Sequence, residues 1–199
     1  MITPEFVEEH GLTSSQYIAS ISDKYREKWD KKLDQVSFND EQLEFLHQDL
    51  LPIKAAIFSA EWCPDCQNAV PIVIKMAEET EGLDLVIIDR DEHVDELKDY
   101  QINGGLRVPF VLFTNNKYQE LTRWVERSQL AYELIYKAKM RALDENTDDY
   151  GQFVRQSFHE RSKDLFKANL ESIFEQFRKA MYIRNSAAKL EEFGQQLTA

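Results

Sequence analysis

Two closely spaced cysteines are the residues of this 199-residue sequence best suited to chemistry. Cys63 and Cys66 enclose Pro64 and Asp65, and the sequence contains no other cysteine. An apolar run ends just before Cys63 and an amphipathic stretch follows Cys66, so we expect the pair where a strand passes into a helix. Unpaired N–H groups and the positive end of the helix dipole stabilise a thiolate at such a position. Cys66 follows Cys63 by three residues, which places both on one helix face within reach of a disulfide bond.

The sequence around this pair predicts a strand, a helix and a second strand. Residues 53–59 and 83–88 are short apolar runs of the kind that form buried strands. Residues 67–79 have helical spacing of apolar side chains and contain Pro71, which is expected to kink the helix. The order strand, helix, strand predicts a βαβ unit in which the strands are parallel and the crossover is right-handed.

A β-hairpin is predicted after this unit. Residues 108–113 and 118–125 are rich in apolar and aromatic side chains, and Asn115 and Asn116 lie between them. Asparagine tolerates a positive φ angle, so we expect the turn to use these two residues. The two strands would then be antiparallel, and the sheet as a whole mixed.

Helical periodicity predicts helices on both sides of this α/β core. An apolar stripe from Phe166 to Met181 keeps helical spacing, and we interpret it as the internal seam of a helical subdomain. A dimer interface or a partner groove is the alternative. We divide the chain into N-terminal helices over 1–50, a central domain over 51–143 and a C-terminal helical extension over 144–199. The predicted helices cover residues 4–10, 14–33, 40–50, 92–100, about 128–143, 152–184 and 186–193.

Three features together resemble the thioredoxin superfamily. They are the segment from Trp62 to Cys66, a proline at position 71 five residues after the second cysteine, and the Val108–Pro109 step that opens the hairpin. The resemblance covers about residues 50–143. It implies a thioredoxin-like α/β fold, a mixed sheet flanked by helices, with the N-terminal helices and the C-terminal extension as additions. It also implies that Cys63 attacks a substrate disulfide and that Cys66 resolves the mixed disulfide.

The resemblance assigns further roles around the cysteine pair. Trp62 would be an aromatic surface for substrate docking, although an aromatic side chain at this position could also belong to the core. Pro109 would be a cis-proline that faces the disulfide. The backbone of Val108 would pair with an extended substrate segment. Pro64 and Asp65 would tune the redox potential, and the charge of Asp65 is expected to oppose thiolate formation in part.

The sequence also departs from the thioredoxin pattern. Ile57 stands where the family has a buried acid that assists the second cysteine, so Cys66 would need another base, such as water or Glu61. The segment 102–107 before Pro109 is longer than usual, which changes the rim where substrates dock. No Gly-Gly pair follows Pro109, which argues against a glutathione site like that of glutaredoxins.

Charge and composition exclude several classes of protein. The formal net charge is −12 and no cluster of basic residues is present, so binding to nucleic acid or to an anionic membrane is not expected. No apolar run is long enough to span a bilayer. The N-terminal segment MITPEFVEEH lacks the features of a secretion signal, and we therefore expect a cytoplasmic protein.

We expect neither a metal ion nor another bound cofactor. Two thiols alone leave a zinc site incomplete, and the four histidines lie far apart in the sequence. These are His10, His47, His93 and His159.

The function predicted from the sequence is that of a thiol–disulfide oxidoreductase, more reducing than oxidising. Its partners would be a disulfide-containing protein or a small thiol substrate, and an external thiol or a reductase as electron donor. A redox-sensing adaptor that binds partners through the helical extension is the alternative, and a homodimer through this extension stays open. A non-catalytic scaffold is a third reading, which the intact cysteine pair disfavours.

Overall fold

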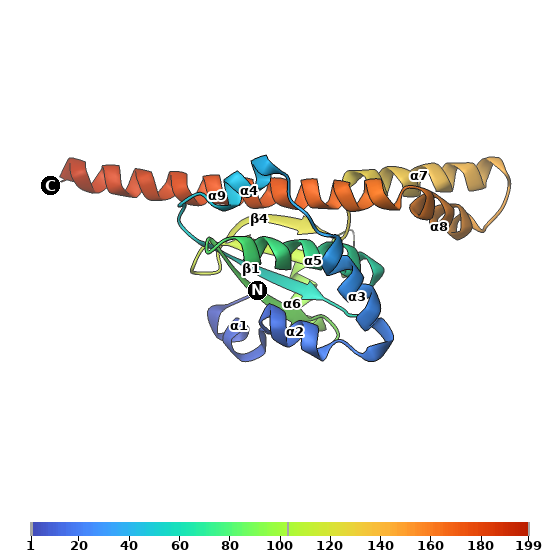
Figure 1. The fold of residues 1–199 in the computed structure, drawn as a ribbon, viewed down its shortest axis with the longest axis horizontal. Coiled ribbons are helices and arrows are strands. Elements are labelled where there is room, and N and C mark those ends of the chain that lie inside the picture. The colour runs from blue at the N-terminus through green and yellow to red at the C-terminus, as the bar shows by residue number, and fades with distance from the viewer. Residues whose placement is uncertain (1, 103, 199) are drawn as a thin grey trace. The chain divides into compact units, whose positions relative to one another are not determined.

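The computed structural model describes residues 2–102 and 104–198, with side chains described as far as residue 188. Its centre is a four-stranded mixed sheet with strand order β2-β1-β3-β4 (Figure 1). The predicted α/β class is therefore confirmed. The strands are β1 (Ile53–Ser59), β2 (Leu83–Asp89), β3 (Phe110–Thr114) and β4 (Glu120–Val125).

Strand pairing confirms the predicted strand directions. β1 pairs with β2 in parallel, and β3 pairs with both β1 and β4 in antiparallel orientation. Ile57, at the middle of β1, lies opposite Ile87 on one side and Val111 on the other. Both faces of β1 are covered by other elements, which explains why its sequence is a continuous apolar run rather than an alternating one.

The hairpin turn is formed differently from the prediction. The positive φ angle is at Tyr118 (57°), not at Asn115 or Asn116. Asn115 instead acts through its side chain, because its Oδ1 accepts the N–H groups of Lys117 at 2.9 Å and of Gln119 at 3.1 Å. An asparagine that satisfies turn N–H groups in this way has no need of left-handed backbone.

The N-terminal region begins with α1 (Pro4–His10), which has the predicted bounds and is capped by the Thr3 side chain, an acceptor for the N–H group of Phe6. The single helix predicted over 14–33 is wrong, because the structure contains α2 (Ser14–Ser20) and α3 (Asp23–Gln35) with extended backbone at Ile21. The guanidinium of Arg26 stabilises the break by donating to the carbonyl oxygens at the end of α2, at 3.1 Å for Ala19 and 2.8 Å for Ile21.

Three other predicted helices are confirmed with different bounds. α4 (Asp40–Leu46) ends four residues earlier than predicted, because the chain leaves the helix at His47 to reach β1. α5 (Pro64–Glu79) begins three residues earlier, since Cys63 caps it, and it contains Pro71 as expected. The helix predicted over 92–100 is reduced to α6 (Val94–Leu97) and the short 3-10 helix η1 (Lys98–Tyr100).

The C-terminal helices are α7 (Gln129–Asp144), α8 (Tyr150–Glu160) and α9 (Ser162–Thr198). The continuous helix predicted over 152–184 is wrong, because α8 ends at Arg161, whose φ and ψ are −108° and 21°. The separate helix predicted over 186–193 is also wrong, since these residues continue α9. The apolar residues after Arg161 keep helical spacing, so their pattern gives no indication of the break at this residue.

Packing divides the chain into two compact units. One consists of Met1–Glu126 together with Ile173–Ala199, and the other of Arg127–Ser172. These units follow packing rather than sequence, and the three-part division at residues 50 and 143 stays a prediction.

The middle of α9, around Phe177, belongs to the first unit, which corrects the interpretation of its apolar stripe. The Phe177 ring lies 6.1 Å from that of Phe113 in β3 and 6.0 Å from that of Phe45 in α4. The hydroxyl of Thr122 in β4 donates to the carbonyl oxygen of Gln176 at 2.9 Å. This part of the stripe therefore contacts the sheet and is not the seam of a separate helical subdomain.

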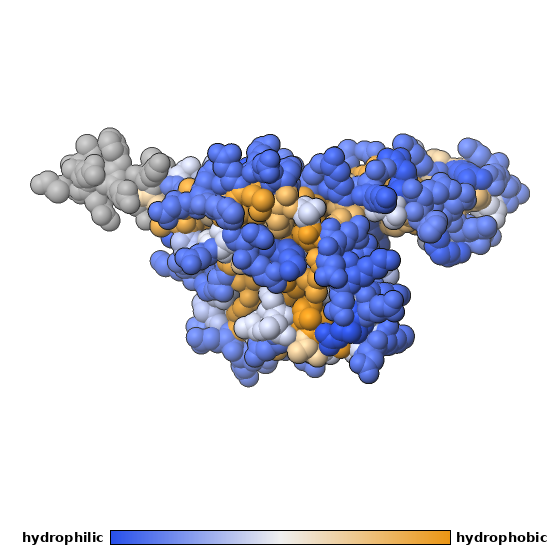
Figure 2. Space-filling model, viewed as in Figure 1, coloured by the Kyte–Doolittle hydropathy of each residue, from blue (hydrophilic) through white to orange (hydrophobic). Residues whose placement is uncertain are grey.

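The remaining helices of the first unit surround the sheet. α5 packs against β1 and β2, and α3 packs against α5 (Figure 1). On the face shown in Figure 2, hydrophilic residues cover most of the surface, and apolar residues are visible among them. Among the described residues, no helix combines the length and apolar character needed to cross a membrane.

Candidate active site

The two cysteines lie at the junction of β1 and α5, as predicted. Cys63 is the N-cap residue of α5, with extended backbone (φ −76°, ψ 120°), and Pro64 occupies the first helical turn. The Cys63 Sγ accepts the N–H group of Cys66 at 3.5 Å. A sulfur that caps a helix lies where the N–H groups and the helix dipole favour negative charge. Both cysteines are free thiols in the structure.

The surroundings of Cys63 favour its thiolate. A hydrogen bond from the Cys66 thiol is the main cause that lowers the pKa of Cys63, and the N–H group of Cys66 adds to it. Burial and the negative charge of Asp65 act in the opposite direction, but the net result is a pKa below the ordinary value. Cys63 is the sulfur of the pair that ionises first.

Cys66 has the opposite character. Its side chain is fully buried, and burial is the main cause that raises its pKa well above the ordinary value. The neighbouring Cys63 raises this pKa further, first because it accepts a hydrogen bond from the protonated Cys66 and then because two thiolates repel each other. The N–H group of Ala60 donates to the Cys66 Sγ at 3.5 Å and partly offsets this effect. The site therefore contains one reactive thiol and one protected thiol.

Replacing Asp65 with asparagine tests the electrostatic balance at Cys63. Because the aspartate charge raises the pKa of Cys63, its removal is expected to lower that pKa and to stabilise the reduced pair, which makes the protein more oxidising. The pH dependence of Cys63 alkylation measures the first effect, and titration against a thiol buffer measures the second. Glu78→Gln, at the far end of α5, is the matched control. An unchanged alkylation profile in Asp65→Asn would contradict this assignment.

The Val108–Pro109 segment lies next to Cys63 although it is 45 residues away in the sequence. The Cys63 thiol donates to the carbonyl oxygen of Val108 at 3.7 Å, and the Val108–Pro109 peptide bond is cis. The Pro109 carbonyl oxygen accepts the N–H group of Glu126 at 2.8 Å. Glu126 has a positive φ of 59° and its buried carboxylate lies 3.6 Å from the Arg107 guanidinium. Nothing in the residues around Glu126 marks this acid as buried, so the sequence carries no signal for it.

Trp62 lies at the edge of the site with 46% of its surface exposed. Its indole N–H donates to the Asp91 carboxylate at 2.7 Å, and this bond is the main cause that lowers the pKa of Asp91. The indole is thus held at the surface by Asp91 rather than buried in the core. Behind it, the backbone carbonyl of Glu61 accepts the side-chain N–H groups of Trp29 at 3.0 Å and of Gln67 at 2.8 Å.

The side chain of Glu61 is directed to another element. Its carboxylate accepts the N–H group of Ser22 at 2.6 Å and the Ser22 hydroxyl at 2.9 Å. Ser22 is the N-cap residue of α3, so Glu61 stabilises the start of that helix. Ile57, at the position of the family's buried acid, is fully buried in β1. Neither residue is positioned by a described contact to take a proton from Cys66.

A buried hydroxyl pair was not recognised in the sequence. The hydroxyls of Tyr17 in α2 and Ser59 in β1 lie 2.7 Å apart, and both side chains are almost completely buried. Ser59 is followed by Ala60, whose N–H donates to the Cys66 Sγ, and the Ser59 hydroxyl acts to lower the pKa of Cys66. A serine at the end of an apolar strand is the only local signal, and Tyr17 lies 42 residues from it.

Two histidines expected to be separate lie together. The rings of His10 and His93 are 4.4 Å apart, with the Phe6 ring beside both. Within residues 2–102 and 104–198, no group of three or more histidine, cysteine or acidic side chains is arranged to hold a metal ion.

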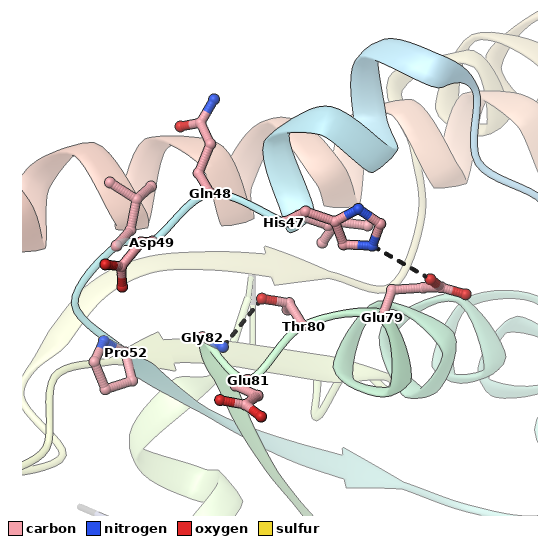
Figure 3. Close-up of a pocket in the computed structure, with 10 residues that line it drawn as sticks. His47, Gln48, Asp49, Pro52, Glu79, Thr80, Glu81 and Gly82 are labelled. Carbon is pink, nitrogen blue, oxygen red and sulfur yellow. Dashed lines mark hydrogen bonds and ion pairs between the residues drawn. The ribbon is translucent and has the colours of Figure 1, made fainter.

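A cavity of about 520 Å³ lies at the other end of the sheet, where β1 begins (Figure 3). His47 and Glu79 line it with their side chains 3.7 Å apart, and the Thr80 hydroxyl accepts the N–H group of Gly82 at 3.0 Å. β1 has seven residues, which corresponds to roughly 20 Å between this cavity and the cysteines. The cavity is therefore separate from the cysteine site.

A dithiol at the first turn of the helix after a central strand, opposite a proline segment, is the arrangement of thiol–disulfide oxidoreductases. The family model described as thioredoxin matches residues 11–145, which is more than half of the sequence. The chain belongs to the thioredoxin family. The match begins before residue 50, so it extends further than the resemblance seen in the motifs and includes α2, α3 and α4.

Curated relatives carry the name glutaredoxin. The chain is 38% identical over 72 residues to glutaredoxin-1 of vaccinia virus (strain Copenhagen), a match that covers 35% of this chain and 67% of the relative. The match to glutaredoxin-1 of monkeypox virus has the same extent. These relatives support the general class of thiol–disulfide oxidoreductases.

Solved structures show that the fold occurs elsewhere. A Pseudomonas aeruginosa protein of unknown function aligns with a TM-score of 0.65 and 15% identity, over 90% of this chain and 99% of that chain. An HIV epitope scaffold aligns with a TM-score of 0.59 and 18% identity, over 66% of this chain and 82% of that one. At these identities the likeness shows the fold alone.

Proposed function

We propose that the protein is a disulfide reductase that works through the Cys63/Cys66 pair. The observation that carries the proposal is the difference between the two thiols, since Cys63 has a lowered pKa and Cys66 is buried with a raised one. A dithiol reductase needs one sulfur that attacks the substrate and a second that stays protonated until the mixed disulfide has formed. Cys63 and Cys66 have these two properties at a spacing that permits a disulfide bond.

The reaction has two exchange steps. The Cys63 thiolate attacks one sulfur of the substrate disulfide, so that a mixed disulfide forms and the other substrate sulfur leaves as a thiolate. Cys66 then loses its proton and attacks Cys63. The Cys63–Cys66 disulfide forms, the second substrate sulfur is released, and the substrate has gained two electrons. An external thiol or a reductase returns two electrons to the pair.

The surroundings of Cys63 define where a substrate would dock. Trp62 presents an exposed indole on one side, and the Val108–Pro109 segment lies against the sulfur on another. An extended substrate segment would pair with the backbone of Val108 while its disulfide meets Cys63, with Pro109 facing the bond. Pro64 and Asp65, between the cysteines, would set the potential.

The electron donor is a separate part of the proposal. The name of the viral relatives makes glutathione one donor to test, whereas the absence of a Gly-Gly pair after Pro109 argues against a glutathione site. We favour another thiol or a reductase. Reduction of substrate disulfides, rather than their formation, is consistent with the cytoplasmic location proposed from the sequence.

A redox titration of the purified protein tests the proposal. We expect one reversible two-electron transition at a reducing potential, followed by Trp62 fluorescence and by thiol labelling against a defined thiol buffer. Cys63→Ser and Cys66→Ser should each remove the transition, because a single thiol cannot form the internal disulfide. No reversible transition in the unaltered protein would reject the reductase.

A redox-sensing adaptor is the second candidate, and the surface of α7 favours it. Exposed apolar side chains lie at steps of four, four and three residues, which places them on one helix face. They are Tyr132, Tyr136, Met140 and Leu143. For an adaptor, Tyr136→Lys with Leu143→Lys would abolish partner binding while the redox transition persists. For a reductase, the same double variant would retain full turnover of its substrates.

A further inference from the structure

The second exchange step poses a chemical problem that the cysteine pair alone does not solve. Cys66 must become a thiolate to attack Cys63, yet its sulfur is fully buried and burial penalises the charged form. Glu61 caps α3 through Ser22, and Ile57 carries no proton acceptor. The thiolate must therefore be stabilised by neighbouring groups that can donate hydrogen bonds.

Two hydroxyl groups are placed to do this. Ser59 ends β1 and is directly followed by Ala60, whose N–H donates to the Cys66 sulfur at 3.5 Å. The Ser59 hydroxyl lies 2.7 Å from the Tyr17 hydroxyl and acts to lower the pKa of Cys66. When Tyr17 donates to Ser59, the Ser59 hydrogen is free to point at Cys66, because each hydroxyl has one hydrogen to donate.

The position of Tyr17 is rigidly defined. Its side chain is 2% exposed, and its ring packs edge-on against Trp29 with 5.5 Å between ring centroids. Trp29 in turn donates to the backbone of Glu61, two residues before Cys63. The titratable groups that face this hydroxyl chain are Cys63, Asp89 and Glu61, and all of them oppose ionisation of Tyr17 or Cys66. Tyr17 therefore stays a neutral donor.

We propose that Ser59 is a catalytic hydrogen-bond donor to the Cys66 thiolate and that Tyr17 is the positioning residue that orients it. The inference rests on the proposed reductase function and adds the group that makes its second step fast. As the bond between Cys66 and Cys63 forms, the bond between Cys63 and the substrate sulfur breaks. The proton of Cys66 ends on the departing thiolate or in solvent. The two hydroxyls keep their own protons throughout.

The two exchange steps can be measured separately with dithiobis(nitrobenzoate), a disulfide that yields a coloured thiolate at each step. One equivalent is mixed with the reduced full-length protein in a stopped-flow instrument. The first release reports attack by Cys63, and the second reports resolution by Cys66. Ser59→Ala is expected to slow the second release by about tenfold, since it removes a hydrogen bond to a charged group. Tyr17→Phe should slow it by about threefold, and both should leave the first release within about twofold.

Two further readouts separate this role from a structural one. The pH at which the second release is half-maximal should rise in both variants, because the Cys66 thiolate is less stabilised. The double variant should be no slower than Ser59→Ala alone, since Tyr17 acts through Ser59. Thr122→Val is the matched control, because it removes another buried hydroxyl, which bonds to Gln176, and should change neither release.

The outcomes are distinct. An unchanged second release in Ser59→Ala and Tyr17→Phe would overturn the hydroxyl pair while leaving the reductase intact. Equal slowing of both releases, or the same slowing in Thr122→Val, would show a structural role and would also overturn it. If the unaltered protein produces no coloured thiolate, the proposed function itself fails. Should Ser59→Ala not fold, Tyr17→Phe alone decides, since it keeps the ring and removes one hydroxyl.

Discussion

Replacing Cys66 with serine is expected to turn the protein into a trap for its substrate. Cys63 keeps its thiolate-stabilising position at the start of α5 and still attacks a disulfide. Without the second thiol the mixed disulfide cannot be resolved internally, so a covalent complex through Cys63 should accumulate. Mass spectrometry of the protein after incubation with a disulfide-containing protein measures the complex, which a reducing agent should release.

The matched variant Cys63→Ser should form no complex and should reduce the turnover of disulfides to the uncatalysed rate. Attack by Cys63 in the unaltered protein should increase with pH and level off below the ordinary thiol pKa of about 8.5, because the pKa of Cys63 is lowered. A complex that forms through Cys66 in Cys63→Ser would reverse the assignment of the two roles.

Truncating Phe177 to alanine is expected to cause the largest loss of stability among the substitutions considered. Its side chain is 1% exposed and lies among the rings of Phe45, Phe113 and Phe174. Removing a buried phenyl group leaves a cavity and typically costs about 3–5 kcal/mol. Urea unfolding measured by circular dichroism gives the change in free energy of unfolding.

Ile183→Ala on the same helix is the matched control for Phe177→Ala. Ile183 is 40% exposed, so its truncation should change the free energy of unfolding by about 0.5 kcal/mol or less. If Phe177→Ala has an equally small effect, the middle of α9 does not pack on the sheet as described.

Local sequence accounts for the position of the cysteine pair and for the strands. A seven-residue apolar run became β1 with the predicted bounds, because a strand covered on both faces needs no polar alternation. The capping role of Cys63 follows from its place directly before Pro64, since a proline at the first helical position marks a helix start. The neighbours of these residues in the sequence are also their neighbours in space.

The spacing of apolar residues predicted several helix ends at the wrong positions. Apolar residues continue in helical register across Ile21, yet the chain breaks there because Arg26 binds the open carbonyls of α2 and Glu61 caps α3. The apolar stripe around Phe177 was equally visible, but its period does not say which surface it covers. Periodicity defines a buried face, and only the tertiary structure defines what lies against it.

What the sequence determined by itself is the presence of a reactive dithiol on an α/β scaffold. What the tertiary structure decided is the environment that separates the two thiols chemically. Val108 reaches Cys63 across 45 residues of sequence, and Tyr17 reaches Ser59 across 42. The acidities of buried sulfurs depend on burial and on donors within a few ångströms, and chain folding rather than sequence spacing brings these donors together.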